Sequence, residues 1–102
     1  MEEPFDPATA RTYVLAILEG PGVTVFSKRA KADLMASGMT SVDAVNVLRG
    51  GQIAKPSPSG SGWTYRADTR RMSVEFSFRC HGRDASADPN ELVLESARRN
   101  NR

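Results

Sequence analysis

Arginine side chains gather beside aromatic residues in WTYRADTRRMSVEFSF, the stretch from residue 63 to residue 78. Arg66, Arg70 and Arg71 lie within six positions, next to Tyr65. A guanidinium group stays charged at physiological pH, and its fork of donors matches the oxygens of a phosphate. Such groups suit the binding of a phosphodiester and the stabilisation of the charge that develops when it is cleaved. The stretch therefore raises RNA as a candidate ligand.

Cleavage of RNA without a metal needs three functions at one site. The 2′-hydroxyl must lose a proton, the phosphorane must be stabilised, and the departing 5′ oxygen must receive a proton. Arginine and lysine suit the second function, and Tyr65 or Glu75 could transfer protons or hold the scissile nucleotide. The alternative is an ordinary solvated strand face, and the hairpin by itself does not decide between the two interpretations.

Two neighbouring groups of residues also have a purely structural interpretation. Lys28, Arg29 and Lys31 would be charges on the solvated face of a helix. Trp63 and Tyr65 share one face of a predicted strand, so packing in or around the core is favoured over base stacking.

Several familiar sites are excluded by the residue types. One Cys and one His cannot form a zinc centre, and neither GxxxxGK[ST] nor GxGxxG occurs in the chain. A Ser-His-Asp triad would depend on His81, which lies in a predicted loop. Metal-dependent hydrolysis by paired carboxylates is disfavoured because the acidic residues are scattered along the chain. Cys80 has no partner for an internal disulfide and is expected to be buried. We expect no metal and no cofactor.

Size and composition indicate one globular domain, residues 1–102, with frayed ends at 1–5 and 99–102. Of the 102 residues, 39% are hydrophobic and 25% are charged, as in ordinary globular proteins. The apolar stretches are shorter than the roughly 18 residues of a membrane span. The acidic start MEEPFD differs from a signal peptide, so we expect a cytoplasmic protein.

The positive charge is unevenly distributed along the chain. The net charge of +2 is too small to indicate a nucleic-acid partner. Residues 1 to 62 carry six basic and six acidic residues, whereas eight arginines and six acids follow from residue 63. The whole surplus therefore lies in the C-terminal part.

Helix signals dominate the first half of the chain. Asp6 and Pro7 predict a helix start, and Gly20 predicts its end. VTVF, residues 23 to 26, predicts an extended lead-in or an edge strand, and Ser27 predicts the N-cap of a second helix over residues 28 to 37. The apolar face of the first helix is predicted to comprise Tyr13, Val14, Ile17 and Leu18.

A third helix is predicted from Ser41 to Arg49. Thr40 and Asp43 have the spacing of a capping box. An apolar stripe at a spacing of three is expected to pack on a sheet, and it consists of Val42, Val45 and Leu48.

Strand signals follow. QIAK predicts a short strand, and PSPSGSG (residues 56 to 62) predicts a loop. The stretch from residue 63 predicts a hairpin, and ELVLESA predicts a last strand. In MSVEFSFRC, alternation directs the apolar residues to the core and Ser73, Glu75, Ser77 and Arg79 to the other face. The sequence predicts an α+β fold in which two to three N-terminal helices pack on a four-stranded antiparallel sheet.

The order of these segments resembles that of small bacterial domains related to the MqsR and RelE-type toxins. VFSKRAKADLMASGMTSVDAVNVLRGGQI, GWTYRADTRRMSVEFSFR and ELVLESARR correspond to a helical pair FSKHA…M…GI…DV..VL..G.I, a strand pair WRYRV…I.VVVAF and a last strand LVVVTAWR. The resemblance extends from Val23 to Arg99.

The resemblance implies a barnase, EndoU, colicin and RelE-like fold, with two helices against a curved antiparallel sheet. It also implies a metal-independent endoribonuclease that cleaves mRNA and is blocked by an antitoxin protein. By position, Lys28 matches the lysine of SKHA, Tyr65 and Arg66 match the YR pair, and Arg98 matches the arginine that closes the last strand.

This sequence departs from that pattern at two places. Arg29 stands where the family most often has histidine, so a fixed cation replaces an acid-base group. ESAR replaces TAWR, which removes an aromatic residue and adds Glu95. Both changes are compatible with phosphate binding. The alternative to a nuclease is therefore a catalytically inactive module that binds RNA or protein.

The site expected from sequence joins the hairpin, the second helix and the last strand. Arg66, Arg79 and Arg98 would hold the scissile phosphate. Strand alternation directs Tyr65 and Arg66 to opposite faces, so one of them is structural unless a bulge intervenes. The residues assigned to catalysis are Lys28, Arg29, Tyr65, Arg66, Glu75 and Arg98, and those assigned to substrate binding are Arg79, Arg70 and Arg71.

Overall fold

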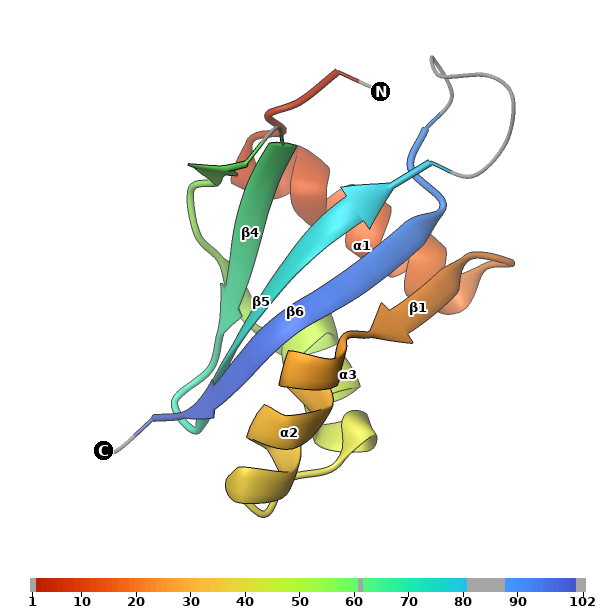
Figure 1. The fold of residues 1–102 in the computed structure, drawn as a ribbon. Helices are drawn as coiled ribbons and strands as arrows, with labels where there is room; N and C mark the ends of the chain where they lie inside the picture. The colour runs from red at the N-terminus through yellow and green to blue at the C-terminus, as the bar shows by residue number, and fades with distance from the viewer. Residues whose placement is uncertain (1, 61, 81–87, 101–102) are drawn as a thin grey trace.

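The computed structural model describes residues 2–60, 62–80 and 88–100, and within them the chain forms three helices and a six-stranded, mostly antiparallel sheet (Figure 1). The strands are hydrogen-bonded in the order β1-β6-β5-β4-β2, and β3 also pairs with β4. His81 lies outside the described residues. In chain order the elements are α1 (Pro7–Glu19), β1 (Val23–Phe26), α2 (Lys28–Ala36), α3 (Ser41–Gly50), β2 (Gln52–Ile53), β3 (Ser57–Ser59), β4 (Gly62–Asp68), β5 (Met72–Arg79) and β6 (Glu91–Arg99).

Each helix begins at a predicted cap. The Asp6 carboxylate accepts a hydrogen bond from Thr9 N in the first turn of α1, and the Ser27 hydroxyl accepts one from Ala30 N in the first turn of α2. At α3, Thr40 and Asp43 form both hydrogen bonds of the capping box. These caps satisfy backbone donors that have no partner inside the helix. Among the described residues, no helix is both long enough and apolar enough to span a membrane.

The buried face of α3 differs from the predicted one. Ala44, Val47 and Leu48 are buried, whereas Val42 is 65% exposed. A spacing of three drifts around a helix that has 3.6 residues per turn, so residues three and four apart share one face. Leu48 lies on this face, and the predicted stripe through Val42 was wrong.

The sheet contains the four predicted strands and two more. β1 is an edge strand, one of the two alternatives predicted for VTVF, and it pairs in parallel with β6, from Val23 opposite Glu91 to Phe26 opposite Leu94. β3 forms within the segment that was predicted to be a loop, and it pairs with the start of β4. Pro58 is tolerated there because an edge strand does not need every N–H in the ladder. The expectation of four strands and a loop was therefore incomplete.

The helices α1 and α3 cover one face of the sheet, behind it in Figure 1. The apolar side chains of β5 are buried at alternate positions from Met72 to Phe78, as predicted. Ser73, on the polar face, is buried as well, and Cys80 is only partly buried. The N-terminal segment also belongs to the core, because Phe5 is buried and packs on Tyr13 and other rings. The largest fully buried side chains are Tyr65, Phe76, Leu48, Met72, Leu92, Leu94, Val14 and Val74.

Candidate functional site

The opposite face of the sheet carries polar side chains in rows that cross β4, β5 and β6. In one row, Arg66 of β4 lies opposite Glu75 of β5, and Glu75 lies opposite Ser96 of β6. Ser96 Oγ donates a hydrogen bond of 2.6 Å to Glu75 Oε1. Directly opposed residues in a sheet have Cβ atoms about 4.5–5.5 Å apart, so these side chains are neighbours. The strand register thus places the side chain of Arg66 next to that of Glu75.

A β-bulge adds Glu95 to this face. The pairing of β5 with β6 shifts between Glu75 and Phe76, which leaves Glu95 as the extra residue of β6. Its carboxylate accepts hydrogen bonds from Thr64 at 3.3 Å and from Ser77 at 3.1 Å. Thr64 on β4 and Ser77 on β5 both lie on the polar face, so the bulge places a second carboxylate on that face.

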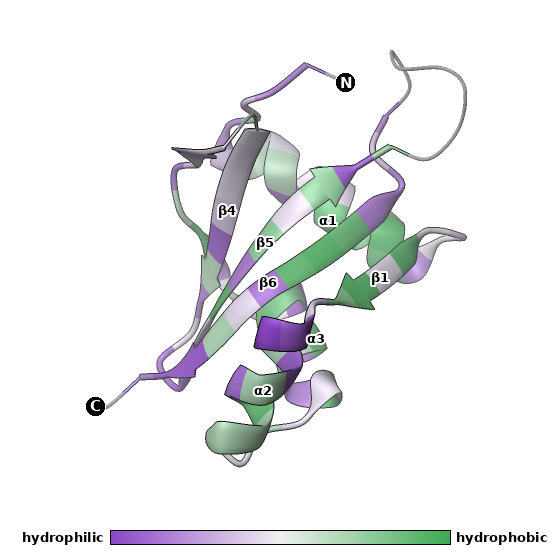
Figure 2. Cartoon of the chain, viewed as in Figure 1, coloured by the Kyte–Doolittle hydropathy of each residue, from purple (hydrophilic) through white to green (hydrophobic). Residues whose placement is uncertain are grey.

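The bulge also anchors α2. Ser27 N donates to Leu94 O, and the Ser27 hydroxyl donates to Glu95 O, both at 3.0 Å. Further along, Ala97 N donates to Asp33 Oδ2 at 3.0 Å, so α2 occupies the edge of β6 beyond the end of β1. Figure 2 shows strongly hydrophilic residues in the first turn of α2 and at the end of β6. Arg29, in that first turn, is thereby held next to the polar face.

These elements enclose a hollow of about 310 Å³, which we call the Glu75 hollow. Arginines from α2, β4 and β6 meet in it. Its charged lining residues are Arg29, Asp33, Arg66, Glu75 and Arg98. An adjoining Lys55 hollow of about 300 Å³ shares Arg29, Arg66 and Glu75 and adds Lys55 and Glu95. A phosphate in the Glu75 hollow would therefore lie among three arginines and two carboxylates.

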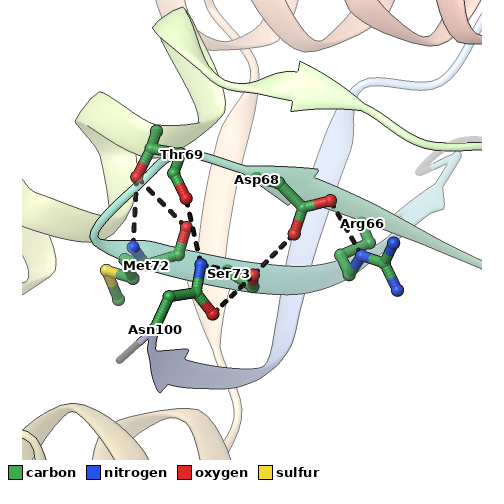
Figure 3. Close-up of polar contacts among 6 residues, drawn as sticks. All are labelled: Arg66, Asp68, Thr69, Met72, Ser73 and Asn100. Atoms are coloured by element: carbon green, nitrogen blue, oxygen red, sulfur yellow. Dashed lines mark hydrogen bonds and ion pairs between the residues drawn. The ribbon is translucent and has the colours of Figure 1, made fainter. Parts of the chain in front are cut away.

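A hydrogen-bonded network fixes one wall of the Glu75 hollow (Figure 3). Arg66 Nε donates to Asp68 Oδ2 at 2.9 Å, and Ser73 Oγ donates to Asp68 Oδ1 at 2.5 Å. Asn100 Nδ2 donates to Ser73 Oγ at 3.1 Å and to Thr69 O at 3.0 Å. Burial opposes ionisation of Asp68, but these hydrogen bonds and the charges of Arg66 and Arg98 lower its pKa. The carboxylate thus stays ionised and orients Arg66.

Tyr65 points away from this site. Its side chain is only 1% exposed and packs against Phe5, Phe76 and Phe78 on the helix-covered face. The hydroxyl accepts a hydrogen bond from Phe5 N and donates one to Glu3. β4 pairs with β5 in a continuous register through this pair, so Arg66 and Tyr65 lie on opposite faces. Tyr65 is the structural member of the pair.

The remaining predicted residues lie outside the Glu75 hollow. Lys28 is exposed at the first position of α2, and Arg79 is paired with Glu91 at the far end of β5. Arg70 and Arg71 are exposed in the turn between β4 and β5. The structure thus brings Arg29, Arg66, Glu75 and Arg98 together and leaves Lys28, Tyr65, Arg79, Arg70 and Arg71 outside that group.

Sequence reasoning did not assign Lys55, Asp68, Glu95 or Ser96 to the site. Alternation could have found Asp68, which follows Arg66 by two positions on the same strand face. Glu95 and Ser96 depend on a bulge that has no clear sequence signal. Lys55 lies between β2 and β3, at the end of QIAK, which was predicted only as a short strand.

Comparison of the chain with known proteins found no matching family model, no matching curated protein and no matching solved structure.

Proposed function

We propose that this chain is a metal-independent endoribonuclease that cleaves mRNA in the cytoplasm. The observation that carries the proposal is the convergence of Arg29, Arg66 and Arg98 on Glu75 in one hollow. Guanidinium groups in this arrangement suit the non-bridging oxygens of a phosphodiester and the extra charge of its phosphorane. A toxin-like role, and an antitoxin protein as the partner that blocks it, follow from the resemblance to MqsR and RelE-related domains alone.

Glu75 is the candidate general base. It would take the proton of the 2′-hydroxyl as that oxygen bonds to phosphorus, and the bond from phosphorus to the 5′ oxygen would break. The products are a 2′,3′-cyclic phosphate and a 5′-hydroxyl, so the leaving oxygen must gain one proton. Glu95 is the candidate donor, because it shares the Lys55 hollow with Glu75. Two carboxylates in one site can divide base and acid roles in this way.

An RNA-binding module without catalysis is the second candidate. It is favoured by the hydrogen bonds that Glu75 and Glu95 accept from Ser96, Ser77 and Thr64. Both carboxylate oxygens of Glu95 are engaged in this way, so the group that would protonate the 5′ oxygen is held within the sheet. Such a module would keep the phosphate-binding arginines and lack a donor for the 5′ oxygen.

The deciding experiment incubates the purified chain with a long RNA in the presence of a chelator. We expect cleavage by the wild type, a loss of about 10²–10⁴-fold in rate for Glu75→Gln with RNA binding retained, and a loss of both binding and rate for Arg98→Ala. Lys31→Ala is the matched control, since Lys31 is an exposed cation on α2 that does not line the Glu75 hollow.

Two results would decide against the nuclease. If the wild type binds RNA in a salt-dependent way without cutting it, the binding module is correct. If Glu75→Gln cleaves as fast as the wild type, the Glu75 hollow is not the catalytic site.

A further inference from the structure

A third hollow, of about 800 Å³, lies where the turn between β4 and β5 meets the end of β6. We call it the Arg99 hollow. Arg66 and Arg98 line it on the side of the Glu75 hollow, and Arg70 and Arg99 extend it toward the C-terminal end of β6. Arg99 was expected in a frayed end, but β6 continues through it, and Asn100 N donates to Arg71 O at 2.8 Å.

The Arg99 hollow and the Glu75 hollow differ in charge. Among the described residues, four arginines and one carboxylate, Asp68, line the Arg99 hollow, a formal charge of +3. Three arginines and two carboxylates line the Glu75 hollow, a formal charge of +1. Asp68 is already engaged by Arg66 and Ser73. The Arg99 hollow therefore favours an anion, and the part of the chain that the structure describes supplies no second carboxylate there for proton transfer, so its chemistry is binding.

The two hollows are continuous. Arg66, Ser73 and Arg98 line both of them. Figure 3 shows the terminal nitrogens of Arg66 directed away from Asp68, which is bonded to Nε. Along β5, Glu75 lines the Glu75 hollow but not the Arg99 hollow, and Ser73, two residues away, lines both. One polynucleotide can therefore occupy both hollows.

The wall that the two hollows share is held by hydrogen bonds within the chain. Asp68, Ser73 and Asn100 are joined in one hydrogen-bonded chain, and Asn100 ties it to the backbone of Thr69 (Figure 3). A wall fixed in this way reduces the conformational entropy that a ligand must remove on binding. The arrangement favours a defined subsite over a diffuse patch of positive charge.

We infer that the Arg99 hollow is a second phosphate subsite, which holds a neighbouring nucleotide of a single-stranded RNA whose scissile phosphate lies in the Glu75 hollow. The inference rests on the proposed function in taking RNA as the ligand. It adds that the chain requires a substrate longer than a dinucleotide for full affinity. Arg70 and Arg99 supply the additional affinity for the longer RNA.

The test measures RNA binding by the double variant Arg70→Ala/Arg99→Ala. Uridine oligomers of two and eight nucleotides with 2′-O-methyl groups serve as probes, because they lack the 2′-hydroxyl needed for cleavage. Fluorescence anisotropy over a series of KCl concentrations gives Kd and its salt dependence. Arg71→Ala is the matched control, since Arg71 is an exposed neighbour of Arg70 outside the Arg99 hollow.

We expect the double variant to bind the octamer about tenfold more weakly, with the slope of log affinity against log salt reduced by about 0.7 for each phosphate that an arginine no longer neutralises. Its affinity for the dimer, and both affinities of Arg71→Ala, should equal those of the wild type. If the wild type binds the octamer and the double variant binds it equally well, the subsite is wrong and the proposed function stands. If the wild type binds neither oligomer, both proposals fail together.

Discussion

The helix-covered face and the open face of the sheet are formed by the same strands, but their side chains have different surroundings. On the covered face Tyr65, Phe76 and Phe78 pack ring against ring. On the open face Arg66 and Glu75 occupy the next positions along the same strands and line a hollow. Burial of apolar surface stabilises the first face, whereas the second holds charges that contribute little to stability. Stability and activity should therefore respond to different substitutions.

The largest expected effect comes from Phe76→Ala. Phe76 is fully buried, with its ring centroid 5.7 Å from that of Tyr65 and 5.6 Å from that of Phe78. Removing the ring leaves a cavity and should lower the free energy of unfolding by about 3–5 kcal/mol. Arg98→Ala on the open face should change it by less than about 0.5 kcal/mol. Urea unfolding followed by circular dichroism measures both, and equal losses would contradict the division between the two faces.

Strand alternation made the two faces predictable from the sequence. Successive side chains of a strand point to opposite sides whatever packs against them, so the apolar positions of β5 from Met72 to Phe78 identified the covered face. The helix caps at Asp6, Ser27 and Thr40 were equally local, because each cap bonds a backbone N–H three residues away. Local chemistry of this kind can be read without knowing the fold.

Other features depend on contacts between distant parts of the chain. The bulge at Glu95 is defined only by the register of β6 against β5. The parallel pairing of β1 with β6 joins residues far apart in sequence, as does the hydrogen bond from Ala97 N to Asp33 that docks α2. Since Arg29 reaches the Glu75 hollow through this docking, the sequence could identify the arginines but could not establish which of them meet.

An intermediate effect is expected for Tyr65→Phe. The substitution removes the hydroxyl that accepts from Phe5 N at 3.0 Å and donates to Glu3 at 2.9 Å. Leaving a buried backbone donor without its partner should cost about 1–2 kcal/mol in the free energy of unfolding. Cleavage of RNA should be unchanged at a temperature where the variant is folded. A loss of cleavage without a loss of stability would mean that Tyr65 takes part in catalysis.

The same variant should alter stability at alkaline pH. Burial raises the pKa of Tyr65 above its ordinary value of 10.0. The unfolded chain therefore loses this proton first as the pH rises, and the free energy of unfolding of the wild type falls from about pH 10 upward. The phenylalanine variant lacks this contribution, so the difference in stability between the two proteins should shrink as the pH rises above 10. A constant difference would contradict the raised pKa.

A small effect is also expected for Asp68→Asn on the open face. Although burial opposes it, the hydrogen bonds from Ser73 and Arg66 lower the pKa of Asp68 below 3.8. The ionised carboxylate therefore contributes stability above pH 3.8, and this contribution is lost as the pH falls through the lowered pKa. Because the side chain is 33% exposed, the contribution should stay below about 1 kcal/mol. Urea unfolding at a series of pH values should show that the stabilities of the wild type and Asp68→Asn converge toward pH 2. A gap of several kcal/mol at neutral pH would mean that the open face stabilises the fold as strongly as the covered face.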